Sequence, residues 1–215
     1  MAYLIVDLSA NNPTPRFKWL KEAGVWGVWL KATEGATYDA AWDVYSEWAP
    51  LARAAGLRVG AYHYAQPTGG DAAAEADNFA ATLEVAGGVQ RRDMRPALDL
   101  EVNPGSLSHR RLVAWARRWN QRTWQLTGTL PVFYTFSWFA VNLHASDPIG
   151  AGLWLANYGP NDGERHSYLV PKPWKKVVAH QYTSRGHIRG AVGEVDVSFA
   201  TSKRPLLAHP ILGYV

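Results

Sequence analysis

The order of apolar and polar positions along the chain predicts parallel strands joined by helices. Short apolar runs alternate with longer stretches of helical periodicity through the first two thirds of the sequence, the pattern expected when crossover helices join parallel strands. The predicted strands lie at residues 3–7, 27–33, 58–65, 95–102, 130–136, 152–158, 177–184 and 195–199. The clearest helix is predicted over about residues 109–126, with Ser108 as its N-cap and Gly128 as its stop signal.

The rhythm changes after Phe136, because mostly loop separates the last three predicted strands. Eight strands, the first five followed by helices or helical turns, predict an α/β fold: a single, irregular TIM-like barrel of five β/α units followed by three β-strands with few helices. An open doubly wound sheet is the alternative. No internal repeat or linker divides the chain, so we expect one domain over residues 1–215.

Composition narrows the classes of protein that fit this pattern. The chain is 47% hydrophobic and 19% charged, as in a globular protein. It has no cysteine, which excludes disulfides, thiol nucleophiles and cysteine-ligated metals. It has no apolar run near the length of a membrane span and no evident signal-peptide core. Its 11 Trp, 10 Tyr and 6 Phe exceed what a core of this size needs, which indicates aromatic residues on a working surface.

Charge is unevenly distributed along the chain. Residues 1–100 hold 9 Lys and Arg against 12 Asp and Glu, whereas residues 101–215 hold 13 against 6. A basic half can serve nucleic acid, anionic membranes or other anionic polymers. The sequence has no contiguous basic tract and no nucleic-acid motif, so charge alone does not select a partner.

The most informative stretch is a pair of acids in the predicted fourth strand. Side chains alternate along a strand, so Asp99 and Glu101 share one face while Leu98, Leu100 and Val102 share the other. The two acids would then point into the barrel at its C-terminal end, where barrel enzymes keep their chemistry. Crowding and partial desolvation raise the pKa of one acid and leave its neighbour ionised, which is the requirement of glycosidic-bond cleavage.

Other acids and polar groups are predicted at the same end. Asp7, Glu34 and Asp196 lie near the ends of other strands, and such clustered anions repel one another, which favours function over stability. Aromatic rings that could stack on sugars lie on or after the predicted strands: Tyr38, Tyr62, Tyr64, Tyr134, Trp154 and Tyr158. Asn157 and Gln181 supply amides that could bind hydroxyl or acetamido groups.

Seven short motifs in this order resemble glycoside hydrolase family 25, the lysozymes of phage endolysins and of some bacterial and fungal cell-wall hydrolases. They are VDLS at 6–9, KATEG at 31–35 with Tyr38, GAYHY at 60–64, LDLE at 98–101, WLANY at 154–158, HQYT at 180–183 and VD at 195–196. The resemblance covers about residues 3–200. It implies a flattened barrel and hydrolysis of the β-1,4 bond between N-acetylmuramic acid and N-acetylglucosamine in peptidoglycan.

The resemblance also implies roles for individual residues. Glu101 resembles the general acid and Asp99 its partner, while Asp7 and Asp196 match the family's other two active-site aspartates, Asp196 in the loosest motif. Substrate-assisted retention through the acetamido group is favoured, with direct attack by Asp99 or an inverting water as alternatives. The residues expected to bind substrate are Glu34, Tyr38, Tyr62, Tyr64, Tyr134, Trp154, Asn157 and Gln181. No cofactor or metal is implied.

Four other interpretations compete with this one. A metal-dependent hydrolase would use His63, His180, Asp7 and Glu34 as ligands, but these residues lack metal-binding spacing. A chitinase-like glycosidase and a catalytically silent peptidoglycan-binding lectin are the closer alternatives. A nucleic-acid binder is disfavoured because acids would line its groove.

The expected partners are peptidoglycan glycan strands and anionic cell-wall polymers. We expect no binding to nucleic acid, no stable association with a membrane, and a monomeric protein. The expected arrangement is a phage endolysin with no separate wall-binding module. Such a protein would lie in the host cytoplasm before lysis and then act on the wall.

Overall fold

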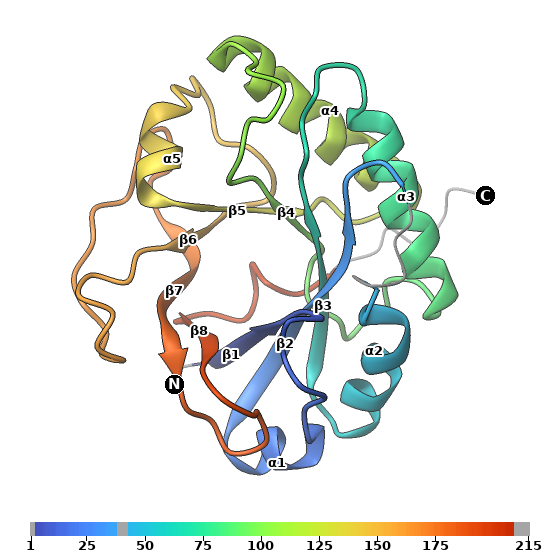
Figure 1. Cartoon of the computed structure of the whole chain (residues 1–215), viewed down its shortest axis with the longest axis vertical. Helices are drawn as coiled ribbons and strands as arrows, with labels where there is room; N and C mark the ends of the chain where they lie inside the picture. Colours follow the sequence, from blue (N-terminus) through green and yellow to red (C-terminus); the bar gives the residue numbers. More distant parts are fainter. Residues whose placement is uncertain (1–2, 38–42, 209–215) are drawn as a thin grey trace.

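The computed structural model describes residues 3–37 and 43–208, whose strands close into one barrel in chain order (Figure 1). The strands are β1 (Tyr3–Leu8), β2 (Val25–Glu34), β3 (Arg58–Tyr64), β4 (Ala97–Asp99), β5 (Val132–Phe136), β6 (Leu153–Ala156), β7 (Val177–Gly186) and β8 (Val195–Ala200). The helices are α1 (Phe17–Glu22), α2 (Tyr45–Ala54), α3 (Ala72–Val85), α4 (His109–Thr127) and α5 (Ser137–Asn142).

Strand direction changes only at the end of the chain. Strands β1 to β7 pair in parallel, whereas β8 runs antiparallel to both β7 and β1. Helices follow β1 to β5 and none follows β6 to β8 among the described residues, so loops cover that side of the barrel (Figure 1). The prediction of five β/α units followed by three strands is confirmed, and the open sheet is wrong.

The fourth strand is shorter than the sequence predicts. It spans Ala97–Asp99 rather than residues 95–102. The Thr135 hydroxyl donates to the Leu100 carbonyl over 2.7 Å, so a side chain from β5 takes the place of a ladder bond. Glu101 therefore lies in the loop beyond the strand, and strict strand alternation does not set its direction.

Two apolar clusters build the barrel, one outside the sheet and one inside it. The outer cluster fills the space between the strands and α1 to α5, and the amphipathic α4 contributes the buried face that its sequence predicts. Gly128 ends this helix in the left-handed conformation, with φ of 67°, as expected of a C-terminal glycine. None of the helices in the described part of the chain is long and apolar enough to cross a membrane.

The inner cluster fills the interior of the barrel. The indoles of Trp29 and Trp154 stack with centroids 3.9 Å apart. Trp29 lies across Gly60, where an added Cβ would meet its ring at 2.2 Å, so this position requires glycine. Trp154 is 1% exposed and its Nε1 donates to the Ser198 hydroxyl over 2.8 Å. The ring of Trp154 therefore fills the barrel, and its predicted contact with substrate stays a prediction.

Candidate active site

Four acids from three strands and one loop meet at the C-terminal end of the parallel strands, which we call the mouth. Asp7 lies on β1, Asp99 ends β4, and Glu101 follows two residues later. Asp196 lies near the start of β8, and the antiparallel direction of that strand places Asp196 opposite Asp7 in the register. The fold thus brings together the four acids that the sequence singled out.

Burial and mutual repulsion dominate the electrostatics of Asp7 and Asp196. Asp7 is buried, and its desolvation and the nearby Asp196 carboxyl raise its pKa well above the ordinary value. Burial, followed by the charge of Glu101, raises the pKa of Asp196 to about 6. These acids consequently hold protons at a pH where an exposed aspartate is ionised.

Asp99 and Glu101 form the second pair. Burial raises the pKa of Asp99 well above its usual range, and the neighbouring Glu101 carboxyl raises it further. Burial also raises the pKa of Glu101, while its contact with Asp99 opposes that shift. Oδ1 of Asp99 is buried and has no hydrogen-bond partner. The pair can therefore carry a transferable proton near neutral pH and still present an acceptor to a bound ligand.

Gln181 on β7 fixes the position of Asp7. Its Nε2 donates to both carboxylate oxygens of Asp7 at 3.0 Å, and its Oε1 accepts from the hydroxyls of Tyr134 and Tyr158, each at 2.7 Å. Gln181 is 1% exposed, so its amide is fully engaged within the protein. The structure shows Gln181 orienting Asp7, and its predicted contact with substrate stays a prediction. Tyr134 is also buried and shares this positioning network.

The ammonium group of Lys31, a residue to which the sequence analysis assigned no role, lies beside the acids. Lys31 Nζ contacts Glu34 Oε2 at 2.6 Å and lies 4.9 Å from the centre of the Tyr64 ring. Its charge lowers the pKa of Asp99 against the stronger effects that raise it. The pairing of β2 with β3 shifts register between Lys31 and Thr33, and a break in strand register changes the direction of the side chains that follow it. The signal available in the sequence was a lysine inside an otherwise apolar strand.

Glu34 is held from a second side. Gln66, in the loop after β3, donates through Nε2 to Glu34 Oε1 over 2.8 Å. Its backbone N–H donates to the buried Glu75 of α3 over 3.1 Å. The loop thus connects the mouth to the outer helical layer. Glu34 remains partly exposed, so a ligand at the mouth can still reach its carboxylate.

The other predicted contacts differ in their access to solvent. Tyr62, Tyr64 and Asn157 are partly exposed at the mouth, whereas Tyr38 lies outside the described residues. The Asn157 side chain donates to the Ser137 hydroxyl over 2.7 Å. Together with Glu34, four of the predicted binding residues are therefore accessible at the mouth.

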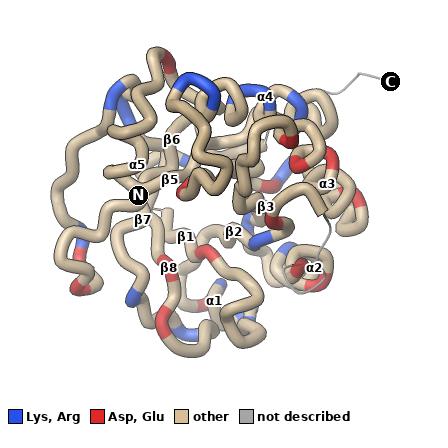
Figure 2. The backbone as a smooth tube through the Cα atoms, turned by 45° about the horizontal axis from the view of Figure 1, so that its top comes forward, with Lys and Arg blue, Asp and Glu red and all other residues tan. Residues whose placement is uncertain are grey.

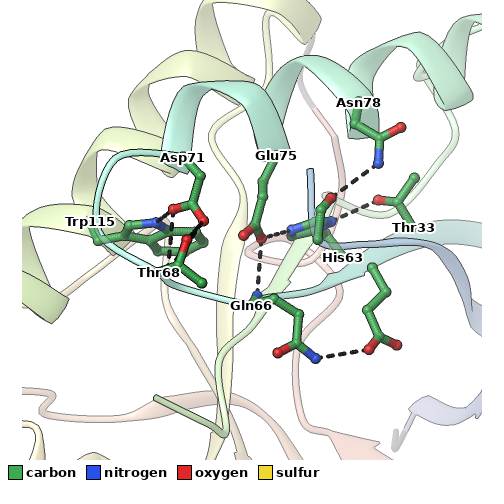
Figure 3. Close-up of polar contacts among 10 residues, drawn as sticks. Thr33, His63, Gln66, Thr68, Asp71, Glu75, Asn78 and Trp115 are labelled. Carbon is green, nitrogen blue, oxygen red and sulfur yellow. Dashed lines mark hydrogen bonds and ion pairs between the residues drawn. The ribbon is translucent and has the colours of Figure 1, made fainter. Parts of the chain in front are cut away.

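The structure does not assemble the alternative metal-ligand set. His63 points out of the barrel, with Nδ1 2.7 Å from the Thr33 hydroxyl and Nε2 2.6 Å from Glu75 (Figure 3). His180 Nε2 contacts the Asn157 carbonyl at 2.8 Å. In the described part of the chain, no three His, Asp or Glu side chains are grouped so that they could hold a metal ion, so these residues do not converge on one ion.

The chain belongs to Glycosyl hydrolases family 25, whose sequence profile matches residues 6–191. Lysozyme M1 of Streptomyces globisporus is 29% identical over 205 residues, which cover 89% of this chain and 65% of that protein. The chain thus spans somewhat less than two thirds of this relative's length.

Solved structures share the barrel. The bacterial lysozyme of Streptomyces coelicolor superposes with a TM-score of 0.78 at 27% identity, covering 93% of this chain and 92% of that one. The catalytic domain of endolysin ply40, from bacteriophage P40 of Listeria monocytogenes, has a TM-score of 0.79 at 24% identity, with 94% and 95% covered. At 24% identity, the similarity to the endolysin domain shows a shared fold and nothing further.

Proposed function

We propose that this protein is a lysozyme that hydrolyses the β-1,4 bond between N-acetylmuramic acid and N-acetylglucosamine in peptidoglycan. The observation that carries the proposal is the buried Asp99–Glu101 pair at the mouth, with Asp7 and Asp196 beside it and Lys31 nearby. Family membership and the lysozymes among its relatives support this choice of substrate.

Glu101 is assigned as the proton donor because it is the more exposed member of the pair. The raised pKa values of both carboxyls let the pair hold a proton, and the reactive state is the one in which Glu101 holds it and Asp99 is ionised. As the bond from C1 to the leaving oxygen breaks, Glu101 gives that oxygen its proton. The acetamido oxygen of the same sugar forms a bond to C1, and the ionised Asp99 accepts a hydrogen bond from the acetamido N–H. Water then attacks C1, Glu101 takes up a proton from it, and the acetamido group is released with the configuration retained.

Direct attack by Asp99 and attack by an activated water are the alternatives for this step. The buried, partnerless Oδ1 of Asp99 favours the substrate-assisted route, because it leaves an acceptor ready for the acetamido N–H. Proton NMR of the first-formed anomer distinguishes inversion from retention. A thiazoline analogue of the cyclised sugar is expected to inhibit the substrate-assisted reaction selectively.

The decisive experiment digests purified peptidoglycan with the wild type and with Glu101→Gln, reduces the products with borohydride and identifies the new reducing sugar by mass spectrometry. Reduced muramic acid ends from the wild type alone are expected. Reduced glucosamine ends would contradict the bond specificity and favour a chitinase-like cleavage. Binding without cleavage by either protein would favour the lectin.

Anionic wall polymers are proposed as additional partners of α4. Arg110, Arg111, Arg117 and Arg118 are exposed on this helix, and Figure 2 shows basic positions gathered along α4 next to acidic positions on α3. A helix face with this charge density attracts polyanions at low ionic strength.

The test compares lysis of whole walls with cleavage of soluble fragments as salt is added. The variant R110Q/R111Q/R118Q is expected to lose the steeper salt dependence on walls. The control R91Q/K203Q/R204Q removes the same charge from exposed positions elsewhere and should retain it. Equal salt dependence of the wild type on both substrates would contradict this partner.

We also propose a role in host lysis by a phage, with accumulation in the host cytoplasm before the wall is reached. The resemblance to endolysin motifs supports this role. The test expresses the protein inside bacteria, with and without a membrane-permeabilising agent. Lysis only after permeabilisation is expected, whereas lysis without it would indicate another route to the wall.

A further inference from the structure

Exposed apolar side chains border the mouth where β5 passes into α5. Trp138, in the first turn of α5, is 67% exposed, and Val141, on the same face one turn later, is 58% exposed. Leu169, in the loop between β6 and β7, is 89% exposed. Water solvates such groups poorly, and their clustering is typical of a contact surface.

A groove with a volume of about 400 Å³ lies between α5 and the loop that follows β6. Val141, Tyr168, Leu169 and Pro171 form apolar parts of its lining. Ser137 and Asn157 add polar groups and are joined by a 2.7 Å hydrogen bond. None of the described residues that line the groove is charged, so its chemistry suits a neutral ligand with apolar faces and hydroxylated edges.

Direct contacts between residues connect the groove to the candidate active site. The ring of Trp138 stacks almost parallel on Phe136, with centroids 6.2 Å apart and planes at 10°. Phe136 packs against the inner cluster that contains Tyr134. The Asn157 backbone N–H donates to the carbonyl of Gln181 over 3.0 Å, and the Gln181 side chain holds Asp7. Two adjacent strands thus lead from the acids to the groove.

We propose that Trp138 and this groove bind saccharide units of the glycan strand beyond the two at the cleaved bond. Trp138 provides a stacking platform at the edge of the mouth, while Ser137 and Asn157 face the hydroxyl groups of the next sugar. This inference rests on the proposed lysozyme function and names a binding surface for its polymeric substrate. The uncharged lining favours a saccharide over the anionic polymers assigned to α4.

The first measurement compares kcat/KM on uncrosslinked glycan strands and on a disaccharide of N-acetylmuramic acid linked to N-acetylglucosamine, which supplies only the two sugars at the cleaved bond. For Trp138→Ala, kcat/KM on long strands is expected to fall about tenfold, mainly through KM, the upper range for loss of one aromatic stacking contact. Cleavage of the disaccharide should be unchanged. The control Trp124→Ala removes another exposed indole, 43% exposed near the end of α4, and should match the wild type on both substrates.

A second measurement does not depend on cleavage. In a Glu101→Gln background, calorimetric titration with long glycan strands should give a Kd about tenfold higher when Trp138 is also replaced by alanine. Leu169→Ser changes a side chain that is 89% exposed, so it should fold normally and show a smaller loss of affinity. Melting temperatures of all variants separate binding effects from unfolding.

The possible outcomes distinguish this inference from the proposed function. Equal losses on the long and short substrates, or a Kd that is unchanged by Trp138→Ala, would overturn the saccharide surface. If the wild type cleaves neither substrate while glycan binding still depends on Trp138, the lysozyme function is wrong and the binding surface remains.

Discussion

Buried carboxylates occur in two regions of this barrel, and their surroundings differ. At the mouth, Asp7 and Asp99 lie among other acids, and burial and repulsion raise the pKa of each. In the outer layer, Asp93 receives two bonds from Arg53, at 2.7 and 3.2 Å, and one from the Gln90 backbone N–H at 2.9 Å. The charge of Asp93 is compensated by the Arg53 cation. At the mouth, repulsion from neighbouring carboxyls outweighs the stabilisation of the ionised form by Gln181 and Lys31.

Glu75 shows that compensation does not require a permanent cation. It is 0% exposed, yet its Oε2 contacts His63 Nε2 at 2.6 Å and accepts from the Gln66 backbone N–H (Figure 3). His63 is in turn stacked on Trp119, with ring centroids 5.2 Å apart. Burial alone therefore does not identify a functional acid. The informative feature is burial next to other acids, because that arrangement costs stability and prepares proton transfer.

The largest expected effect is the loss of activity in Glu101→Gln. The amide cannot donate the proton that the leaving oxygen needs, so kcat should fall by about 10²–10⁴-fold. The melting temperature should not fall, because the substitution removes repulsion at the mouth. Glu194→Gln, at a largely exposed glutamate paired with Arg185, is the control and should keep full activity. Substantial residual activity in Glu101→Gln would contradict the assignment of the acid.

Breaking the Arg53–Asp93 pair should lower stability and leave activity intact, the opposite of the effect of Glu101→Gln. Arg53→Met leaves Asp93 buried without its cation, which should lower the free energy of unfolding by about 3–5 kcal/mol. Activity per folded molecule should be retained at low temperature. Arg117→Met disrupts a largely exposed pair with Asp147, 3.7 Å apart, and should cost less than about 1 kcal/mol. Denaturant unfolding of both variants checks the contrast, and equal losses would contradict it.

Asp196→Asn should increase stability at neutral pH while reducing activity. Because folding raises the pKa of Asp196 from 3.8 to about 6, ionisation of this group destabilises the folded state as the pH rises through that range. The variant should therefore be more stable by about 1–3 kcal/mol above pH 6. Its advantage should disappear as the pH falls towards 4. Chemical unfolding measured across this pH range tests the sign, and an advantage independent of pH would contradict it.

The smallest expected effect concerns the contact that joins the two regions. Gln66→Ala removes the donor to Glu34 and frees the Lys31–Glu34 pair to move. Lys31 lowers the pKa of Asp99, so displacement of its charge should move the acidic limb of the kcat/KM profile to higher pH. We expect a loss of about threefold in kcat/KM, with a cost near that of one hydrogen bond, about 1 kcal/mol.

Asn78→Ala is the control for Gln66→Ala. The Asn78 amide donates to the Gly35 carbonyl over 3.1 Å, so the variant loses a nearby bond without touching Glu34. Its pH profile should match that of the wild type. An identical limb in both variants would show that Gln66 has only a structural role.

The sequence predicted much of the fold because hydrophobic periodicity reports directly which face of an element is buried. It predicted the eight strands, the helix that buries Trp119, and the acids Asp7, Asp99, Glu101 and Asp196 near one end of the barrel. It did not predict that Trp154 and Gln181 are both buried inside the barrel, each 1% exposed. A tryptophan or a glutamine can either pack inside a protein or contact a ligand, and the residue type alone does not distinguish these roles. The surrounding residues in the folded structure decide between them.

The sequence by itself thus determined the architecture, the order of its elements and the residue types available for acid chemistry, because these follow from local periodicity and composition. The tertiary structure decided which of these side chains contact one another. The reversed direction of β8 set Asp196 opposite Asp7, the bulge in β2 brought Lys31 and Glu34 together, and Glu75 was paired with His63. These contacts depend on strand direction, register and helix packing between distant segments, whose energies are shared across the barrel and leave little trace in any short stretch of sequence.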